Sequence, residues 1–421
     1  MIKDRAYRIA IIADIGHSSP RIPGISEEMA KLGVDIDVFT PKLSRKQKKA
    51  FLINLKFNWN LVESRRFPML YKRHINLPKL FRLVFKIYWL LIFKIRFFTL
   101  HSEHKDVQNL SLEHTGWSKF LEKDFLKKEK IKNYDLIFST SSPFECHFIG
   151  NYLAKKYNKV WIADYRDLFS GNYVSKKYTH LRIHEKTIIS NASALTTVSK
   201  DLAKRLRSLY SKEVYVLYNG FQKLYPKRSI IIKNKINILY AGTISEGFQN
   251  YKLILDALKI LNENKIKAEV SFAGSSNSNI TEFYKSNGTE IPKWVNLLGN
   301  LSRNQSLKLQ RKFDVLLYFH WEDRSTTGVL LTKFYEYLAS GTPVLFIGGY
   351  PTDELVLMCN EIGMNKPLKN TDEILAFLEN LYIKKKIQTC RNDSKAENFS
   401  YSQIAKNFDA FIRVLLKTNR L

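Results

Sequence analysis

The stretch "GVLLTKFYEYLASGTPVLFIGG" (Gly328–Gly349) indicates most directly how this chain folds. Lys333–Ser340 has the composition of a short amphipathic helix, with Thr332 at its cap. Gly341 suits the position after the last turn, and Pro343 prevents the helix from continuing. An apolar strand follows. Loop, helix, tight turn and buried strand are the repeating unit of a parallel α/β sheet.

Two opposite charges open this otherwise apolar helix. The first turn of a helix offers free N–H groups and positive partial charge, and Lys333 adds a full positive charge there. Glu336 lies one turn later on the same face. This pattern suits a diphosphate beside a ribose, because a lysine neutralises phosphate and a carboxylate accepts hydrogen bonds from a ribose diol. The alternative is a surface Lys–Glu pair, which is worth roughly a few tenths of a kcal/mol.

The alternation of strands and helices occurs twice along the chain. Tyr7–Asp14 has the continuous apolar character of a strand buried on both faces, and Ile22–Pro41 supplies a helix and a second strand. After the Lys-rich bridge Leu224–Lys235, the pattern restarts with a strand at Ile236–Thr243 and a helix at Tyr251–Asn264. We therefore predict an α/β protein with two doubly wound, Rossmann-like domains.

The domain boundaries follow from this restart. The first domain is expected to span residues 1–225 and the second residues 226–395. Residues 396–421 are expected to form a last amphipathic helix that packs back on the first domain. An insertion of about residues 42–130 interrupts the first domain.

Composition narrows the setting of the protein. Its three cysteines, Cys146, Cys359 and Cys390, form no close pair, which is typical of a reducing, cytoplasmic environment. The N-terminal apolar run is interrupted by Asp14 and is too short for a signal peptide. The net charge of +29 predicts an anionic partner, either a membrane surface or nucleic acid.

Much of this charge lies in the insertion. Residues 41–110 contain 16 Lys and Arg against 3 Asp and Glu. Within it, Leu77–Phe98 is rich in aromatic and aliphatic residues, but its longest uncharged run, Ile87–Phe93, is too short to span a bilayer. Its basic residues gather on one side of a helix, which favours a helix lying on an anionic membrane surface. The alternatives are a core helix with a solvated basic edge and nucleic-acid binding, which we do not expect.

Several segments together resemble the GT-B glycosyltransferases of the group 1 (family 4) kind, in the subgroup that builds bacterial surface polysaccharides. The segments are "WIADYRDLF" (Trp161–Phe169), "ASALTTVSKDLAKRL", "VYVLYNGF", "ILYAGTISEG", "FDVLLYFH" and "YEYLASGTPVL", and they cover nearly the whole chain in the expected order. The resemblance implies two domains facing a central cleft, with the nucleotide-sugar donor on the second domain. It also implies that Glu336 contacts the donor ribose.

This sequence departs from the family at two donor contacts. Many members have a glutamate eight residues before the ribose glutamate, where this chain has Gly328. Many also hold the diphosphate with an arginine after the glycine that follows the first strand of the second domain; that turn, at Gly242 and Thr243, has no arginine here. We expect Lys333 to take over the phosphate contact. The predicted donor-binding residues are Gly242, Thr243, Gly328, Val329, Thr332, Lys333 and Glu336.

Two strand-end loops of the first domain are expected to line the acceptor side. "ADYRD" supplies Asp164 for acceptor binding and Arg166 and Asp167 for catalysis, with Asp167 as a general base; the alternative is a structural Arg–Asp pair. The first loop, "DIGHSSPRIPG", supplies Gly16 and Arg21 for acceptor binding and His17 as a second candidate base. The predicted acceptor-side residues are Gly16, His17, Arg21, Asp164, Arg166 and Asp167.

The resemblance implies a bacterial glycosyltransferase of lipopolysaccharide or capsule assembly that moves a sugar to a lipid-linked glycan with retention at the anomeric carbon. We expect it at the inner face of the plasma membrane, with no bound metal or other cofactor. The rivals are a nucleotide-sugar 2-epimerase of the same fold and a non-catalytic basic scaffold.

Overall fold

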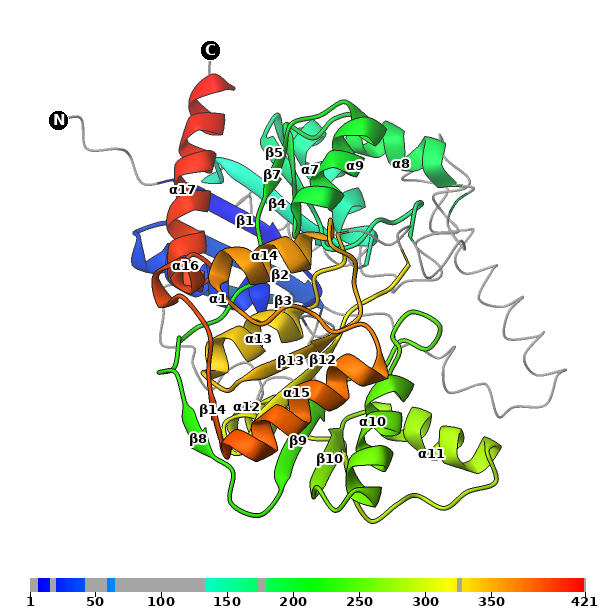
Figure 1. Cartoon of the computed structure of the whole chain (residues 1–421). Helices are drawn as coiled ribbons and strands as arrows, with labels where there is room; N and C mark the ends of the chain where they lie inside the picture. The colour runs from blue at the N-terminus through cyan, green and yellow to red at the C-terminus, as the bar shows by residue number, and fades with distance from the viewer. Residues whose placement is uncertain are drawn as a thin grey trace, which may run out of the picture. The chain divides into compact units, whose positions relative to one another are not determined.

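A computed structural model describes residues 7–15, 20–41, 59–64, 133–141, 143–172, 179, 181–323 and 328–419. The chain divides into two compact units, each described by itself (Figure 1). Unit 1 comprises residues 1–197, 205–215 and 409–421, and unit 2 comprises residues 198–204 and 216–408. The predicted loop residues Gly16 and His17 lie outside the described residues, as does the predicted insertion apart from residues 59–64.

Unit 1 is built on a twisted sheet of mainly parallel strands. Its strands are β1 (Arg8–Ile12), β2 (Asp35–Pro41), β3 (Trp59–Ser64), β4 (Leu136–Ser141), β5 (Val160–Tyr165), β6 (Ala194–Thr197) and β7 (Val214–Val216). They lie in the order β3-β2-β1-β4-β5-β6-β7, and the pairs from β3 to β6 are parallel. The helices are α1 (Arg21–Lys31), α7 (Glu145–Tyr157), α8 (Arg182–Ile189) and most of α9 (Lys200–Tyr210).

The last helix of the chain is shared between the two units. α17 (Tyr401–Thr418) begins in unit 2, and its part from Asp409 onward belongs to unit 1. There the hydroxyl of Tyr7 donates to Asp409 Oδ1 at 2.6 Å, and the ring of Phe411 stacks on Tyr215 with a centroid distance of 4.4 Å. A polar and an aromatic contact thus attach the end of the helix to unit 1.

Unit 2 repeats the parallel design. Its main sheet contains β9 (Ile236–Ala241), β10 (Ala268–Ala273), β11 (Val295–Gly299), β12 (Val315–Phe319) and β13 (Val344–Ile347), in the order β11-β10-β9-β12-β13 with all defined pairs parallel. A small antiparallel sheet joins β8 (Ser229–Ile231) to β14 (Lys386–Gln388). The helices are α10 (Lys252–Glu263), α11 (Ser276–Ser286), α12 (Arg303–Gln310), α13 (Thr332–Ser340), α14 (Glu354–Ile362), α15 (Thr371–Lys384) and α16 (Asp393–Glu397).

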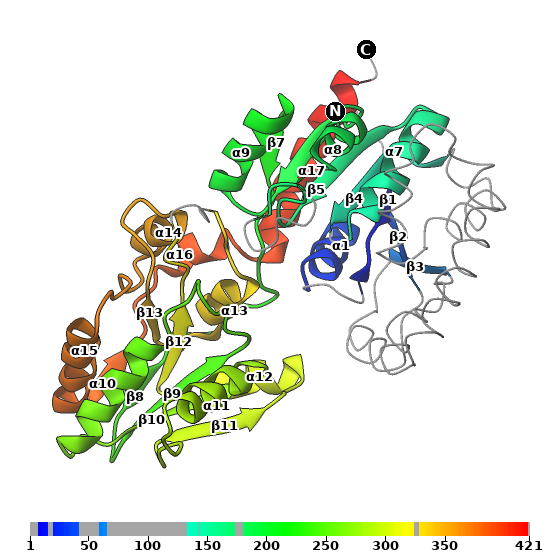
Figure 2. The ribbon, with the colours of Figure 1, turned by 90° about the vertical axis from the view of Figure 1, so that its right-hand side faces the viewer.

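Helices cover both faces of the sheet in unit 2 (Figure 2). Side chains of α10, α11 and α15 pack with Ile238, Phe272 and Leu317 on one face. Side chains of α13 and α14 pack with Leu239 and Leu316 on the other. Because alternate residues of each strand enter opposite cores, the strands are apolar throughout, as expected for a parallel sheet covered on both faces.

Each sheet has one point where the strand order reverses. In unit 1 this point lies between β1 and β4, and in unit 2 between β9 and β12. Ligands of doubly wound proteins bind beyond the carboxyl ends of the strands at such a point. The loops after these four strands are therefore the places to look for a functional site.

The helices that the structure describes include none with both the length and the apolarity required of a membrane span. The predicted membrane-surface helix, Leu77–Phe98, lies outside the described residues.

Candidate functional site

Lys333 lies at the carboxyl edge of the sheet in unit 2. It stands in the first turn of α13, with its Nζ 3.7 Å from the ring centroid of Tyr240. A Cβ atom built on Gly242, the residue after β9, would lie 2.7 Å from both Cε and Nζ of Lys333. The lysine therefore packs directly against the backbone at the point where the strand order reverses.

The charge of Lys333 is poorly matched by the protein. Its side chain is partly buried, and this burial lowers the pKa of the ammonium to about 7, although Glu336 opposes the shift. No ion pair joins Lys333 to a carboxylate in the part of the chain that the structure describes. The ring of Tyr240 offers a cation–π contact, which is weaker than a buried ion pair. An anionic ligand would supply the missing charge.

The start of α13 adds further donors. The cap residue is Leu331, in extended conformation, and no side chain caps the helix. The prediction that Thr332 caps it is therefore wrong: Thr332 is the first helical residue. The N–H of Phe334 donates to the carbonyl of Leu331 at 3.0 Å, but no side chain among the described residues accepts from the first turn. Such helix N-termini bind phosphate in other proteins.

Glycines bring the backbone close to Lys333 at two strand ends. Gly242 has φ of 143°, and Gly274, after β10, has φ of 102°. A Cβ atom on Gly274 would lie 2.9 Å from the carbonyl oxygen of Gly242, so neither loop has room for a side chain. Beside them the hydroxyls of Thr243 and Ser275 are 2.6 Å apart and exposed. This edge offers backbone and hydroxyl groups next to a lysine.

Glu336 lies one turn after Lys333 and contacts a residue that the sequence did not single out. Its Oε1 accepts from Nε of Arg303 at 3.1 Å, and Nη2 of the same guanidinium forms an ion pair with that oxygen at 3.1 Å. Arg303 opens α12, where Ser302 and Gln305 form a capping box. The sequence "SRNQ" could have located this helix start, but nothing in it indicated a contact with α13.

Gly328 has a structural explanation. Its φ is 88°, and a Cβ atom there would lie 2.9 Å from both the backbone nitrogen of Leu202 and Oγ of Ser199. The loop thus packs on the first turn of α9, which leaves no space for the glutamate found in the resembled family. Val329, next to it, is partly buried.

A buried pair that the sequence analysis missed lies at the end of β12. Nε2 of His320 is 2.9 Å from Oδ1 of Asp353, which also accepts from the backbone nitrogen of Leu355 at 2.8 Å. Asp353 thus caps α14 and joins it to β12 at the same sheet edge. Both residues are almost fully buried, which is typical of a contact that fixes the strand end.

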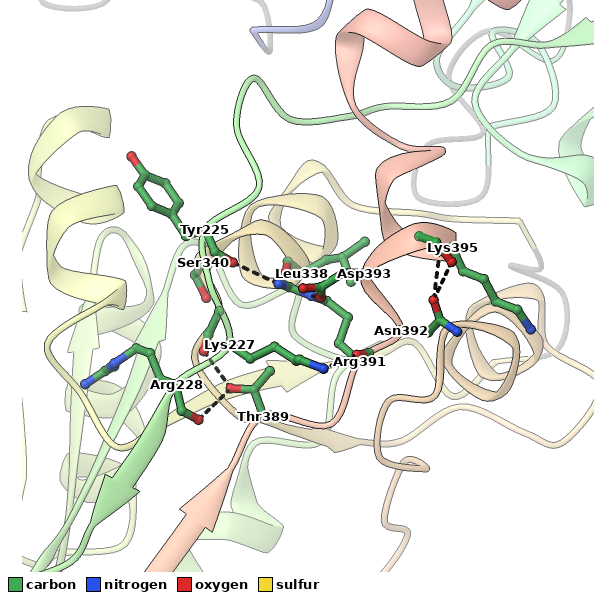
Figure 3. A network of polar contacts seen from close by, with 12 residues as sticks. Tyr225, Lys227, Arg228, Leu338, Ser340, Thr389, Arg391, Asn392, Asp393 and Lys395 are labelled. Carbon is green, nitrogen blue, oxygen red and sulfur yellow. Dashed lines mark hydrogen bonds and ion pairs between the residues drawn. The ribbon is translucent and has the colours of Figure 1, made fainter.

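The far end of α13 is held by a polar network (Figure 3). The guanidinium of Arg391 donates to the carbonyls of Leu338 and Tyr225, and the hydroxyl of Thr389 donates to the carbonyl of Gly341 at 2.5 Å. The backbone nitrogen of Arg228 donates to that same Gly341 carbonyl at 2.9 Å. These donors satisfy carbonyls that the helix end leaves without intrahelical partners, and so fix the helix that carries Lys333 and Glu336.

The corresponding edge of unit 1 is electrostatically closed. Arg21 forms a bidentate pair with Asp164, at 2.6 and 2.9 Å, and both side chains are fully buried. Asp164 also accepts from the hydroxyls of Thr140 and Thr196, at 2.6 and 2.7 Å. Burial alone would raise the pKa of Asp164, but Arg21 and these hydroxyls outweigh it and lower the pKa. Both side chains are thus occupied by this buried network, and their contacts with the acceptor stay predictions.

Arg166 and Asp167 follow β5 at this edge. Nε of Arg166 donates to the carbonyl of Ser141 at 2.8 Å. Asp167 is exposed; nevertheless the surrounding protein desolvates its carboxyl in part and raises the pKa, while Arg166 opposes the shift. An exposed carboxyl with a raised pKa can accept a proton, so the catalytic roles of both residues stay predictions.

The described residues contain no group of three or more His, Cys, Asp or Glu side chains placed to hold a metal ion. The expectation that the protein works without a metal or another cofactor stays a prediction.

Comparison with solved structures identifies the fold. No protein-family model matches the sequence, and no curated protein is similar to it. The structure of Anabaena Alr3699/HepE in complex with UDP-glucose is similar over 96% of this chain and 99% of that chain, with a TM-score of 0.60 and 12% identity. A glycosyltransferase from Rickettsia africae ESF-5 is similar over 98% and 99%, with a TM-score of 0.59 and 14% identity.

The lipopolysaccharide outer core galactosyltransferase WaaB has a TM-score of 0.54 and 14% identity, over 96% of this chain and 99% of WaaB. At such low identity these similarities show the fold alone. The chain has the GT-B fold of these glycosyltransferases, with two Rossmann-like domains, and the predicted fold class is confirmed.

Proposed function

We propose that the protein is a glycosyltransferase that binds a nucleotide-sugar donor on unit 2. One observation carries the proposal: Lys333, a lysine without a carboxylate partner among the described residues, packs against Gly242 at the strand-order reversal of a GT-B fold. Glu336 follows one turn later. HepE, whose fold is similar, is described in complex with UDP, and with UDP-glucose.

In this proposal Lys333 and the first turn of α13 bind the diphosphate, and Glu336 binds the ribose. Gly242 and Thr243 contribute the backbone and hydroxyl of the β9 loop. The bound lysine stabilises the negative charge that develops on the diphosphate as the sugar departs. The departing phosphate takes the acceptor proton in a retaining reaction, while Asp167 is the base of an inverting one.

The acceptor belongs to the same proposal. WaaB is named as a lipopolysaccharide galactosyltransferase, and the basic composition of residues 41–110 suits an anionic membrane surface. We propose a lipid-linked glycan acceptor and a place at the inner face of a bacterial plasma membrane. Binding of the protein to vesicles with and without anionic lipid, at two salt concentrations, tests the membrane part separately.

The donor site is tested with UDP-, GDP-, ADP-, CMP- and dTDP-sugars by calorimetry and by release of the nucleotide. We expect one nucleotide family to bind, and Lys333→Met and Glu336→Ala each to weaken it. The matched controls are Lys384→Ala and Glu263→Ala, which change exposed residues at the ends of α15 and α10. Binding that the controls weaken as much as the site variants would contradict the assignment.

A nucleotide-sugar 2-epimerase is the second candidate. One observation favours it: a structure described as a putative UDP-N-acetylglucosamine 2-epimerase from Listeria monocytogenes is similar over 97% of this chain, with a TM-score of 0.51 and 11% identity. Incubating the protein with UDP-N-acetylglucosamine and analysing the sugar by NMR separates the two candidates. An epimerised sugar favours the epimerase, whereas release of UDP that depends on added acceptor favours the transferase.

A further inference from the structure

The contact between Glu336 and Arg303 uses only half of the carboxylate. Both guanidinium donors, Nε and Nη2, reach the same oxygen, Oε1. In the part of the chain that the structure describes, Oε2 accepts no hydrogen bond from the protein. One oxygen is thus held in place while the other stays available.

This contact is built on fixed backbone. Arg303 is the first residue of α12, whose start is set by a capping box in which Ser302 Oγ accepts from the backbone nitrogen of Gln305 at 3.3 Å, and Gln305 Oε1 accepts from that of Ser302 at 2.9 Å. The opposite partner stands on α13, which the Arg391 network holds at its far end. Contacts other than the Arg303–Glu336 pair therefore hold the backbone of both helices.

The contact contributes little to folding. The Arg303 side chain is 48% exposed and that of Glu336 16% exposed, and ion pairs of this kind add about 0–1 kcal/mol to stability. A carboxylate held in one orientation has less side-chain freedom to lose when a ligand binds. Orientation of Glu336 is thus the main physical consequence of the contact.

We propose that Arg303 is a positioning residue of the donor site: it holds Glu336 through Oε1 and thereby directs Oε2 at the ribose diol. This inference rests on the proposed function. It makes Arg303 a determinant of selectivity for ribonucleotides over nucleotides that lack the diol. Arg303 does so without touching the reacting atoms.

The test compares nucleotides that differ only in the diol. Affinities of UDP and GDP, and of their 2′,3′-dideoxy counterparts, are measured by calorimetry for wild type, Arg303→Met, Arg303→Lys and Glu336→Gln. Wild type is expected to prefer the ribonucleotide by about tenfold or more, because a charged acceptor then pairs with hydroxyl donors. Arg303→Met is expected to reduce this preference to below about threefold and to leave affinity for the dideoxy nucleotide unchanged. Arg303→Lys should restore part of the preference.

The control is Lys308→Met, which removes an exposed positive charge from the same helix and should keep the wild-type preference. If Glu336→Gln abolishes the preference for the ribonucleotide and Arg303→Met does not, the role given to Arg303 is wrong while the proposed function stands. That role is also wrong if Arg303→Met weakens both members of a pair equally, since that marks a direct contact with phosphate or base. If wild type binds no nucleotide, both the proposed function and this inference fall.

Discussion

The two sheet edges of this protein have the same topology and opposite electrostatics. In both units the strand order reverses at a central pair of strands, and a basic residue from a nearby helix lies at the carboxyl edge. In unit 1 this residue is Arg21, which is fully buried and paired with Asp164. In unit 2 it is Lys333. Burial lowers the pKa of its ammonium to about 7.

This difference in how the two charges are paired distinguishes a structural charge from a candidate ligand-binding charge. A buried charge held in a bidentate ion pair already has its counter-charge, and removing one partner is costly. A partly buried charge without a partner is costly in the free protein, and an anion that supplies the partner relieves this cost. The edge with the less satisfied charge is therefore the better candidate for function.

The largest effect is expected from breaking the Arg21–Asp164 pair at the sheet edge of unit 1. Asp164→Ala leaves Arg21 buried without its carboxylate and should lower the free energy of unfolding by about 3–5 kcal/mol. Urea unfolding measures the loss. Glu269→Ala, which removes the half-exposed partner of Lys235, is the control and should cost about 0–1 kcal/mol. A loss at Asp164 no larger than that of the control would remove the distinction between the two edges.

Loosening α13, the helix that carries Lys333, should have the next largest effect. Arg391→Met leaves the carbonyls of Leu338 and Tyr225 without a buried donor and should cost about 2–3 kcal/mol of stability. It should also weaken binding of the nucleotide-sugar identified by the donor screen, because α13 is no longer fixed. Lys395→Met changes an exposed residue nearby and should leave both quantities unchanged. Unaltered stability of Arg391→Met would show that the network does not hold the helix.

Removing the charge of Lys333 at the edge of unit 2 should affect stability in the opposite way to removing that of Asp164 at the edge of unit 1. Lys333→Met removes a partly buried charge but keeps the volume, so the free energy of unfolding should stay equal or rise by up to about 1 kcal/mol. The nucleotide-sugar identified by the donor screen should bind about 10–100-fold more weakly, because one charge-assisted contact with phosphate is lost. A variant that loses stability while it retains affinity would assign Lys333 to the scaffold.

A smaller effect follows from pH. Because the folded pKa of Lys333 lies near 7, the ammonium that binds phosphate is present below pH 7 and is lost as pH rises. Affinity for the nucleoside-diphosphate sugar identified by the donor screen should therefore fall with increasing slope above pH 7, approaching about tenfold per pH unit. Its diphosphate does not titrate in this range, so the protein alone sets the slope. Lys333→Arg should bind with nearly constant affinity from pH 6 to about pH 9, since arginine stays charged.

Local features of both units could be predicted from the sequence. Lys333–Ser340 lies within α13, and Gly341 ends that helix with φ of 72°. Tyr7–Asp14 contains β1, and the restart near Ile236 is β9. These predictions succeed because apolar periodicity, caps and glycines act within a few residues of chain.

Contacts between distant segments were not accessible. Arg21 and Asp164 are 143 residues apart, and Arg303 and Glu336 are 33 apart. Which charge meets which carboxylate depends on the order of the strands, and a single sequence does not reveal that order. For this reason the pairing of Arg21 with Asp164 was not predicted, and Arg303 was missed.

In the proposed donor site, the diphosphate supplies the negative charge that Lys333 lacks among the described residues. Calorimetry of binding of the nucleoside-diphosphate sugar identified by the donor screen, at pH 8 in two buffers that differ in ionisation enthalpy, measures the protons taken up on binding. Wild type is expected to take up about 0.9 proton, since a group with pKa near 7 is mostly neutral at pH 8, and Lys333→Arg is expected to take up none. Binding by wild type without proton uptake, or equal uptake by the two proteins, would contradict this role of Lys333.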